Sequence, residues 1–115
     1  MEEAFGTRLR DLRRAKNISQ RELADRVGVD FSYISKLENN RLPPPAADTV
    51  EKICGALGVS GDELLALAGK VPSDVAEIIA SSPAAQHFMQ NLRAMSLSED
   101  EWHQLTRRVK ELKGR

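Results

Sequence analysis

The sequence predicts an all-α fold, with a five-helix domain over residues 1–69 and a three-helix segment over residues 70–115. Apolar residues recur at helical spacing along most of the chain, as they do on the buried face of a helix. Capping residues and glycines lie between these stretches, where helices begin and end. At 115 residues, the chain is long enough for one small core and a second, minor unit.

The first helix is expected from about Ala4 to Lys16. Phe5, Leu9 and Leu12 recur there at helical spacing, and arginines fill the other faces. The formal net charge of the chain is zero. Affinity for an acidic partner depends on where the basic residues lie, and here they cluster early. These residues are Arg8, Arg10, Arg13, Arg14, Lys16, Arg21 and Arg26.

Two short helices are expected within residues 19–38, which read SQRELADRVGVDFSYISKLE. Ser19 and Glu22 have the spacing of a capping box, in which each side chain bonds the backbone of the other. Gly28 ends this helix, and Asp30 is placed to cap the next one. Because the turn is so short, the two helices must cross steeply. The pattern predicts a helix-turn-helix, whose second helix can enter a DNA major groove.

Two more helices complete the predicted first domain. Three prolines at residues 43–45 indicate an ordered loop, because proline restricts the residue before it. A helix should begin near Ala46. Ser60 and Glu63 have the spacing of a second capping box, and the helix they open should end at Gly69.

The C-terminal segment is expected to contain three helices, at about residues 74–80, 83–94 and 99–113. Ser82 caps the second of these, and Ser98 and Glu101 form a capping box on the third. The last two helices each carry an apolar face, which must pack on something. The alternatives are a second subunit, a partner protein or the core of the first domain. These faces contain Phe88, Leu92, Met95, Trp102, Leu105, Val109 and Leu112.

Three stretches resemble the Cro and phage-repressor family, also called the XRE family of helix-turn-helix regulators. They read LRDLRRAKNISQRELADRVGV, YISKLENN and ADTVEKICGALGVSGDELL, and together they span residues 9–65. The order and spacing of these motifs match the family. The resemblance implies a lambda-repressor-like domain that regulates transcription and binds DNA as a two-fold dimer.

The resemblance also implies which residues would read bases. In the family, residues just inside the third helix point at base edges, and here these are Phe31, Ser32, Ser35 and Lys36. Lys36 can donate to the O6 and N7 atoms of guanine, and the serines can pair with several bases. An exposed Phe31 can lie against a thymine methyl group.

Other positions match residues that approach the DNA backbone. Gln20 lies at the family position next to the recognition helix, where an amide and free N–H groups favour a phosphate. Tyr33 has two open alternatives, since it can pack on the preceding helix or offer its hydroxyl to a phosphate. The candidate phosphate-binding residues are Gln20, Arg21, Tyr33, Asn39, Asn40 and Arg41.

The resemblance further implies an ion pair between Arg13 and Glu38, which would link the first and third helices. We therefore expect Arg13 to serve the scaffold first and a phosphate second, because partly buried charges need partners. Family members often have glycine where Asn40 stands. Asparagine is the next best tolerated residue in a left-handed turn, so this difference fits the same backbone.

The sequence contains no pattern typical of an enzyme or a metal protein. It has no glycine-rich phosphate loop, no nucleophile elbow and no recognisable pair of catalytic carboxylates. His87 and His103 lack partners at metal-ligand spacing, although Glu99 lies one turn from His103. The single cysteine, Cys54, permits no internal disulfide and is expected in the core. No cofactor is expected.

The predicted function is a sequence-specific DNA-binding regulator, a repressor, that places the helix from Phe31 to Asn39 in the major groove of a palindromic operator as a homodimer. Two alternatives remain. One is a protein-interaction adaptor that does not read DNA, and the other is an antitoxin-like regulator that holds a partner with residues 74–113. No apolar run suits a signal peptide or a membrane span, so we expect a cytoplasmic protein without membrane contact.

Overall fold

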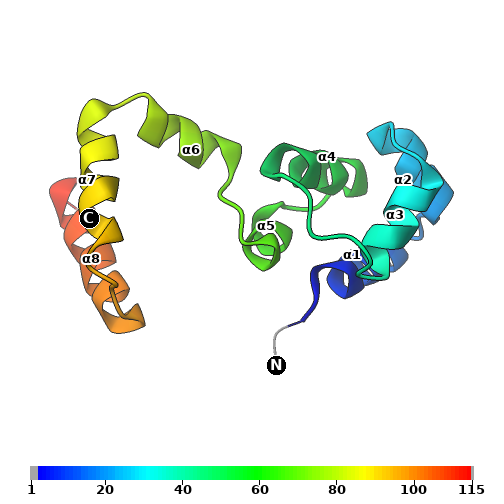
Figure 1. Ribbon diagram of the computed structural model, residues 1–115, viewed down its shortest axis with the longest axis horizontal. Coiled ribbons are helices and arrows are strands. Elements are labelled where there is room, and N and C mark those ends of the chain that lie inside the picture. Colours follow the sequence, from blue (N-terminus) through cyan, green and yellow to red (C-terminus); the bar gives the residue numbers. More distant parts are fainter. Residues whose placement is uncertain (1–2, 115) are drawn as a thin grey trace. The chain divides into compact units, whose positions relative to one another are not determined.

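The computed structural model describes residues 3–114, which form eight α-helices and no strand (Figure 1). The predicted all-α class is therefore confirmed. The helices are α1 Phe5–Ala15, α2 Gln20–Val27, α3 Phe31–Glu38, α4 Ala47–Leu57, α5 Asp62–Ala68, α6 Ser73–Ala80, α7 Pro83–Arg93 and α8 Glu99–Leu112. The predicted helices are present, with bounds close to those expected from the sequence.

The chain divides into two compact units, residues 1–76 and residues 77–115. The division falls within α6, C-terminal to the boundary that we predicted between residues 69 and 70. The functional separation of residues 1–69 from residues 70–115 stays a prediction. No helix in the described part of the chain is long and apolar enough to cross a membrane.

The first unit has a closed hydrophobic core. In this unit α3 packs against α1 and α2, α4 packs against α2 and α5, and α5 packs against α1. Each of the five helices contributes apolar side chains with almost no exposed surface, among them Leu9, Leu23, Ile34, Ile53 and Leu64. Cys54 belongs to the same core, and burial raises the pKa of its thiol.

Two of the predicted caps in this unit are incomplete. Ser19 accepts a hydrogen bond from the Glu22 backbone N–H at 3.0 Å, as expected, but the Glu22 carboxylate does not complete the box. It accepts from Arg26 Nη2 at 2.7 Å instead, because the charged partner lies one turn further along the same helix. Asp30 precedes α3 without making a side-chain cap bond. The expectations of a full box at Ser19 and a side-chain cap at Asp30 were wrong.

The predicted capping box at Ser60 and Glu63 is also absent. The helix α5 begins one residue later than that box requires, after Gly61, and Ser60 Oγ accepts from the Asp62 N–H at 3.3 Å. Glu63 is turned toward α1, where its two carboxylate oxygens accept from Arg8 at 2.8 and 3.0 Å. The Glu63 carboxylate, which was predicted to cap the helix, thus binds an arginine on another helix instead.

The second unit contains well-capped helices but no buried side chain among its described residues. Ser82 Oγ accepts from the Ala85 N–H at 3.1 Å and caps α7. Ser98 and Glu101 form both bonds of the predicted capping box on α8, at 2.9 and 3.1 Å. Side chains of α7 and α8, with Leu97 between them, line a hollow of about 410 Å³. The two helices are therefore neighbours, but they do not enclose a core.

Candidate nucleic-acid interface

The helix α3 has an inner face that points into the core and an outer face that points away from it. Ile34 and Leu37 point into the core and are almost completely buried. Phe31, Ser32 and Lys36 are exposed, and Ser35 is half-buried. The four residues predicted to read bases thus lie away from the buried stripe, as the helical spacing requires.

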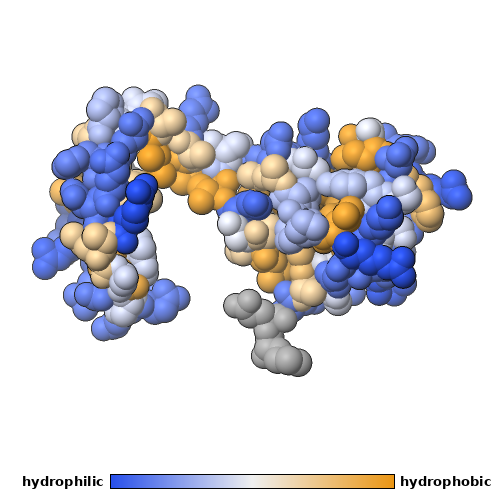
Figure 2. Space-filling view, in the orientation of Figure 1, coloured by the Kyte–Doolittle hydropathy of each residue, from blue (hydrophilic) through white to orange (hydrophobic). Residues whose placement is uncertain are grey.

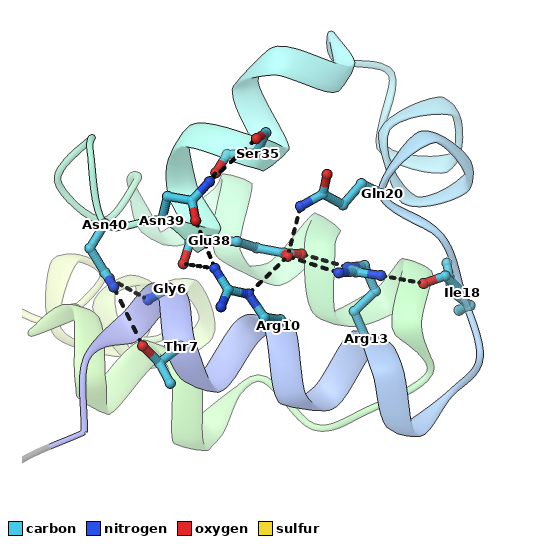
Figure 3. A network of polar contacts seen from close by, with 10 residues as sticks. All are labelled: Gly6, Thr7, Arg10, Arg13, Ile18, Gln20, Ser35, Glu38, Asn39 and Asn40. Carbon is cyan, nitrogen blue, oxygen red and sulfur yellow. Dashed lines mark hydrogen bonds and ion pairs between the residues drawn. The ribbon is translucent and has the colours of Figure 1, made fainter.

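The position of α3 is fixed by a buried ion pair with α1. Arg13 Nε donates to Glu38 Oε2 at 2.6 Å, and Arg13 Nη2 donates to Glu38 Oε1 at 2.9 Å (Figure 3). The third hydrogen bond of this guanidinium goes from Nη1 to the Ile18 carbonyl oxygen at 2.8 Å. The hydrogen bonds to the Glu38 carboxylate raise the pKa of Arg13, so the guanidinium stays charged. Arg13 therefore belongs to the scaffold in this structure.

The same carboxylate also binds two residues that the sequence did not connect with it. Gln20 Nε2 donates to Glu38 Oε1 at 2.9 Å, and Arg10 Nε lies 3.7 Å from that oxygen. Figure 3 shows Gln20 reaching from α2 toward the Glu38 carboxylate, which lies between α1, α2 and α3. One buried side chain thus ties the first turn of α2 to the last turn of α3.

The end of α3 is held by a second set of bonds to α1. Arg10 Nη2 donates to Asn39 Oδ1 at 2.8 Å, and Asn39 Nδ2 donates to the Ser35 carbonyl oxygen at 2.9 Å. Arg10 Nη2 also donates to the Glu38 carbonyl oxygen at 3.2 Å. These bonds use both ends of the Asn39 amide within the protein.

Asn40 joins the end of α3 to the first turn of α1. Its φ of 57° is left-handed, as predicted for this position. Asn40 Oδ1 accepts from the Gly6 N–H at 2.9 Å, and Asn40 Nδ2 donates to Thr7 Oγ1 at 3.4 Å (Figure 3). Gly6 permits this approach, because a Cβ there would collide with the backbone carbonyl oxygens of Leu37 and Glu38. Gly6 is a positioning residue that was not predicted from the sequence, because no residue pattern around it indicates this close contact.

The side chains of two other predicted phosphate-binding residues have no polar partner among the described residues. Arg41 is exposed just beyond α3, and none of the hydrogen bonds or ion pairs in the described region involves its guanidinium. Tyr33 is half-buried and packs against the core, and its two predicted alternatives stay open. A contact between its hydroxyl and a phosphate stays a prediction.

Arg21 has an aromatic neighbour instead of a polar one. Its Cζ atom lies over the Phe31 ring, 4.7 Å from the ring centroid. Phe31 is the first residue of α3 and remains 40% exposed. The sequence predicts a phosphate contact for Arg21 and a base contact for Phe31, and it does not connect the two residues. This contact joins a side chain on α2 to an aromatic ring on α3, so it forms only when the two helices pack against each other.

The apolar faces of α7 and α8 remain largely uncovered. Phe88, Met95, Trp102, Val109 and Leu112 are exposed, whereas Leu92 and Leu105 are half-buried. Figure 2 also shows apolar surface over α6, and the exposed apolar residues of that helix include Val75 and Ile78. Residues 3–114 contain no group of three or more His, Cys, Asp or Glu that could hold a metal ion.

These features define a helix-turn-helix protein, in which a short α2 and a rigidly held α3 present polar residues to solvent. Comparison with known proteins supports this class. A family model described as helix-turn-helix matches residues 9–64. The uncharacterised HTH-type transcriptional regulator y4dJ of Sinorhizobium fredii is 35% identical over 72 residues, which cover 63% of this chain and 92% of y4dJ.

The uncharacterised HTH-type transcriptional regulator RghRB of Bacillus subtilis is 35% identical over 82 residues, covering 71% of this chain and 59% of that regulator. The chain spans little more than half the length of several curated relatives that it matches. The chain belongs to the helix-turn-helix family, whose members named here are transcriptional regulators and not enzymes.

Solved structures agree with the predicted lambda-repressor-like fold of the first domain. The structure of SinR, described as the master regulator for biofilm formation, in complex with DNA matches with a TM-score of 0.50 and 38% identity, covering 53% of this chain and 97% of that one. The DNA-binding domain of the P22 C2 repressor matches with a TM-score of 0.52 and 32% identity, covering 56% of this chain and 86% of that one. The fold prediction is confirmed.

Proposed function

We propose that this protein is a sequence-specific DNA-binding transcriptional regulator that acts as a repressor. The observation that carries the proposal is the exposed polar face of α3, which the buried Arg13–Glu38 pair holds in place. The relatives' names support regulation of transcription, and the SinR structure contains DNA. A helix held by two buried hydrogen bonds from Arg13 and by half-buried ones from Gln20 and Arg10 can enter a major groove without losing its shape.

Base reading would come from the four residues on that face. Lys36 can donate to guanine O6 and N7, whereas Ser32 and Ser35 can donate to or accept from several bases. The exposed ring of Phe31 provides an apolar surface for a thymine methyl group. Together these groups favour a site of mixed composition over an A·T tract.

Phosphate contacts would flank this face. Arg41 is the strongest candidate, because its guanidinium is exposed and its fork matches phosphate oxygens. Tyr33 can add its hydroxyl. Gln20, Asn39 and Asn40 remain candidates by position, but their side-chain amides already have partners within the protein. A phosphate would therefore have to use their backbone N–H groups or replace an internal bond.

We further propose that the regulator binds a palindromic operator as a homodimer. Two-fold symmetry would place the two copies of α3 about 34–36 Å apart, one helical turn of DNA. The exposed apolar faces of α7 and α8 support a dimer, because a face without buried contacts in one chain is stabilised when a second chain covers it. Sedimentation of wild type and of Leu105→Glu would test this, with Lys110→Glu as a surface control. A dimer disrupted only by Leu105→Glu is expected, and a monomeric wild type would contradict the proposal.

The roles on the DNA side can be separated by two substitutions. Lys36→Ala should cost about 1–3 kcal/mol of binding free energy on the operator and relax discrimination at one base pair. Arg41→Ala should weaken binding to operator and random duplex alike. Fluorescence anisotropy on both duplexes at several salt concentrations measures each effect. Equal losses for both variants on both duplexes would contradict the division of roles.

A second candidate function keeps DNA binding and adds a protein partner on the C-terminal helices. The observation that favours it is the same uncovered apolar face of α7 and α8, which any amphipathic helix of suitable length could cover. Pull-down with the full chain from the native cell, followed by mass determination of the complex, distinguishes the two. Recovery of a homodimer alone would exclude the partner.

A further inference from the structure

We infer that Arg21 and Phe31 act as one recognition unit, in which Phe31 orients the Arg21 guanidinium toward a base edge. The pair would read a guanine next to a thymine, so Arg21 becomes a specificity-determining residue instead of a general phosphate contact. This inference rests on the proposed function and deepens it, because it names a base step that the operator must contain.

The first support is the state of the Arg21 side chain. Its guanidinium lies over the Phe31 ring at 4.7 Å from the centroid, and no hydrogen bond or ion pair in the described region involves it. The adjacent acid, Glu22, binds Arg26. The ring lies on one side of the guanidinium, whose N–H groups have no partner in the described region and are free to donate.

The second support is the place of the pair. Phe31 is the first residue of α3, and the N-terminal residues of a recognition helix are those that approach base edges. Ser32, the next residue, is exposed as well. An arginine tied to this end of α3 is carried into the groove together with it. An arginine that served only a phosphate would need no such aromatic platform, because long flexible side chains reach the DNA backbone without one.

The chemistry of the two side chains then selects the bases. A guanidinium fork donates two hydrogen bonds to O6 and N7 of guanine, which no other base pair accepts in the same arrangement. The part of the Phe31 ring left exposed is apolar, and thymine is the base that presents a methyl group in the major groove. Since the two side chains touch each other, their bases must be neighbours on the duplex.

Preorganisation strengthens this reading. A cation–π contact restricts the rotamers of a side chain that would otherwise lose much freedom on binding. Less entropy is therefore lost when the fork meets guanine. Lysine at this position would keep the charge but lose both the fork and the planar stacking.

The test starts from a duplex selected by the wild-type chain from a random pool. We expect a thymine–guanine step in each half-site. Replacing that guanine by 7-deazaguanine removes the N7 acceptor, one of the two that the fork binds, and should weaken wild-type binding by part of the roughly 5- to 150-fold that a whole bidentate contact contributes. Replacing the thymine by uracil removes one methyl group and should weaken it about fourfold.

Variants identify the side chains responsible. Arg21→Ala should lose most of its affinity for the selected duplex and become insensitive to 7-deazaguanine. Phe31→Ala should become insensitive to uracil and respond less to 7-deazaguanine, because both the apolar surface for the methyl group and the platform for Arg21 are gone. Arg21→Lys should resemble Arg21→Ala in discrimination. Arg41→Ala is the phosphate control and should keep the full response to both modified bases.

Two contrary results have different meanings. If Arg21→Ala weakens binding to all duplexes equally and lowers the salt slope by about one, Arg21 is a phosphate contact and the inference is overturned while the proposed function stands. If the wild-type chain selects no sequence, both fail. A selected site without a thymine–guanine step also overturns the inference alone.

Discussion

The two units of this chain have equally well-formed helices but differ in what those helices bury. The unit of residues 1–76 encloses a core and an ion pair, whereas no described side chain of α7 or α8 is buried. Helix caps are, if anything, more complete in the second unit, where Ser98 and Glu101 form the full box. Caps and periodicity thus determine where helices form, but burial depends on what packs against them.

The contrast suggests a division of labour. The first unit has the rigidity that the proposed base reading would require, because the buried Arg13–Glu38 pair and a half-buried bond from Gln20 fix α3. The second unit has the uncovered apolar surface that association requires.

The buried ion pair should dominate the polar contribution to the first unit. Glu38→Ala leaves the Arg13 guanidinium buried without its carboxylate and removes the acceptor of Gln20. We expect a loss of about 3–5 kcal/mol in the free energy of unfolding, measured by urea denaturation followed by circular dichroism. Glu22→Gln, which removes an exposed pair with Arg26, should cost only about 0.3–0.5 kcal/mol. Similar losses for the two variants would contradict a structural role for burial.

Truncating one leucine in each unit compares the units directly. Leu9→Ala removes a side chain with no exposed surface and should cost about 2–5 kcal/mol. Leu112 is 82% exposed, so Leu112→Ala should leave the unfolding free energy of the chain at low protein concentration within about 0.5 kcal/mol. Thermal unfolding at two protein concentrations measures both. A large effect of Leu112→Ala at low concentration would show that α8 packs within one chain.

Alanine substitutions at two glycines should change the stability of the chain in opposite directions. Gly6→Ala places a methyl group against the backbone oxygens of Leu37 and Glu38, which cannot swing aside, and should destabilise the chain by about 1–3 kcal/mol. Gly55 lies within α4 with open space around it, so Gly55→Ala should stabilise the chain by about 0.8–1 kcal/mol. Calorimetry of both variants is the measurement. A neutral Gly6→Ala would mean that α1 does not lie this close to α3.

The smallest effect concerns the cap of α8. The hydrogen bond from the Ser98 backbone lowers the pKa of Glu101 below its ordinary value of 4.5. Because this pKa is lower in the folded chain, the carboxylate stabilises α8 above pH 4.5 and loses that contribution as the pH falls through the folded pKa. Helix content should therefore decline slightly on acidification in wild type, and less in Glu101→Gln. An equal decline in wild type and in Glu101→Gln would show that the Ser98–Glu101 cap does not cause the loss of helix content at low pH.

The sequence predicted the helices because their signals are local. Gly28 and Gly69 end their helices in left-handed conformations, and Ser98 caps α8 as the pattern required. The failed caps at Glu22 and Glu63 had a common cause, since an arginine took each carboxylate. The i, i+4 spacing of Glu22 and Arg26 was visible in the sequence and could have warned of the first failure.

The contacts between α3 and the neighbouring helices could not be predicted from the sequence. The bond from Gln20 to Glu38, the bond from Gly6 to Asn40, and the stacking of Arg21 on Phe31 join residues on different helices. Each depends on how α1, α2 and α3 pack, which helical periodicity does not specify. The resemblance to phage repressors supplied the Arg13–Glu38 pair because it carries tertiary information that the pattern of one chain lacks.

The most direct test of the account is the distribution of bound DNA sequences selected by the full chain from a random pool, together with the mass of the complex. The account predicts two inverted half-sites about one helical turn apart, bound by two chains, with selectivity lost in a variant that carries Ser32→Ala and Lys36→Ala. Binding that shows no sequence preference, or selectivity that survives both substitutions, would contradict the claim that α3 reads DNA.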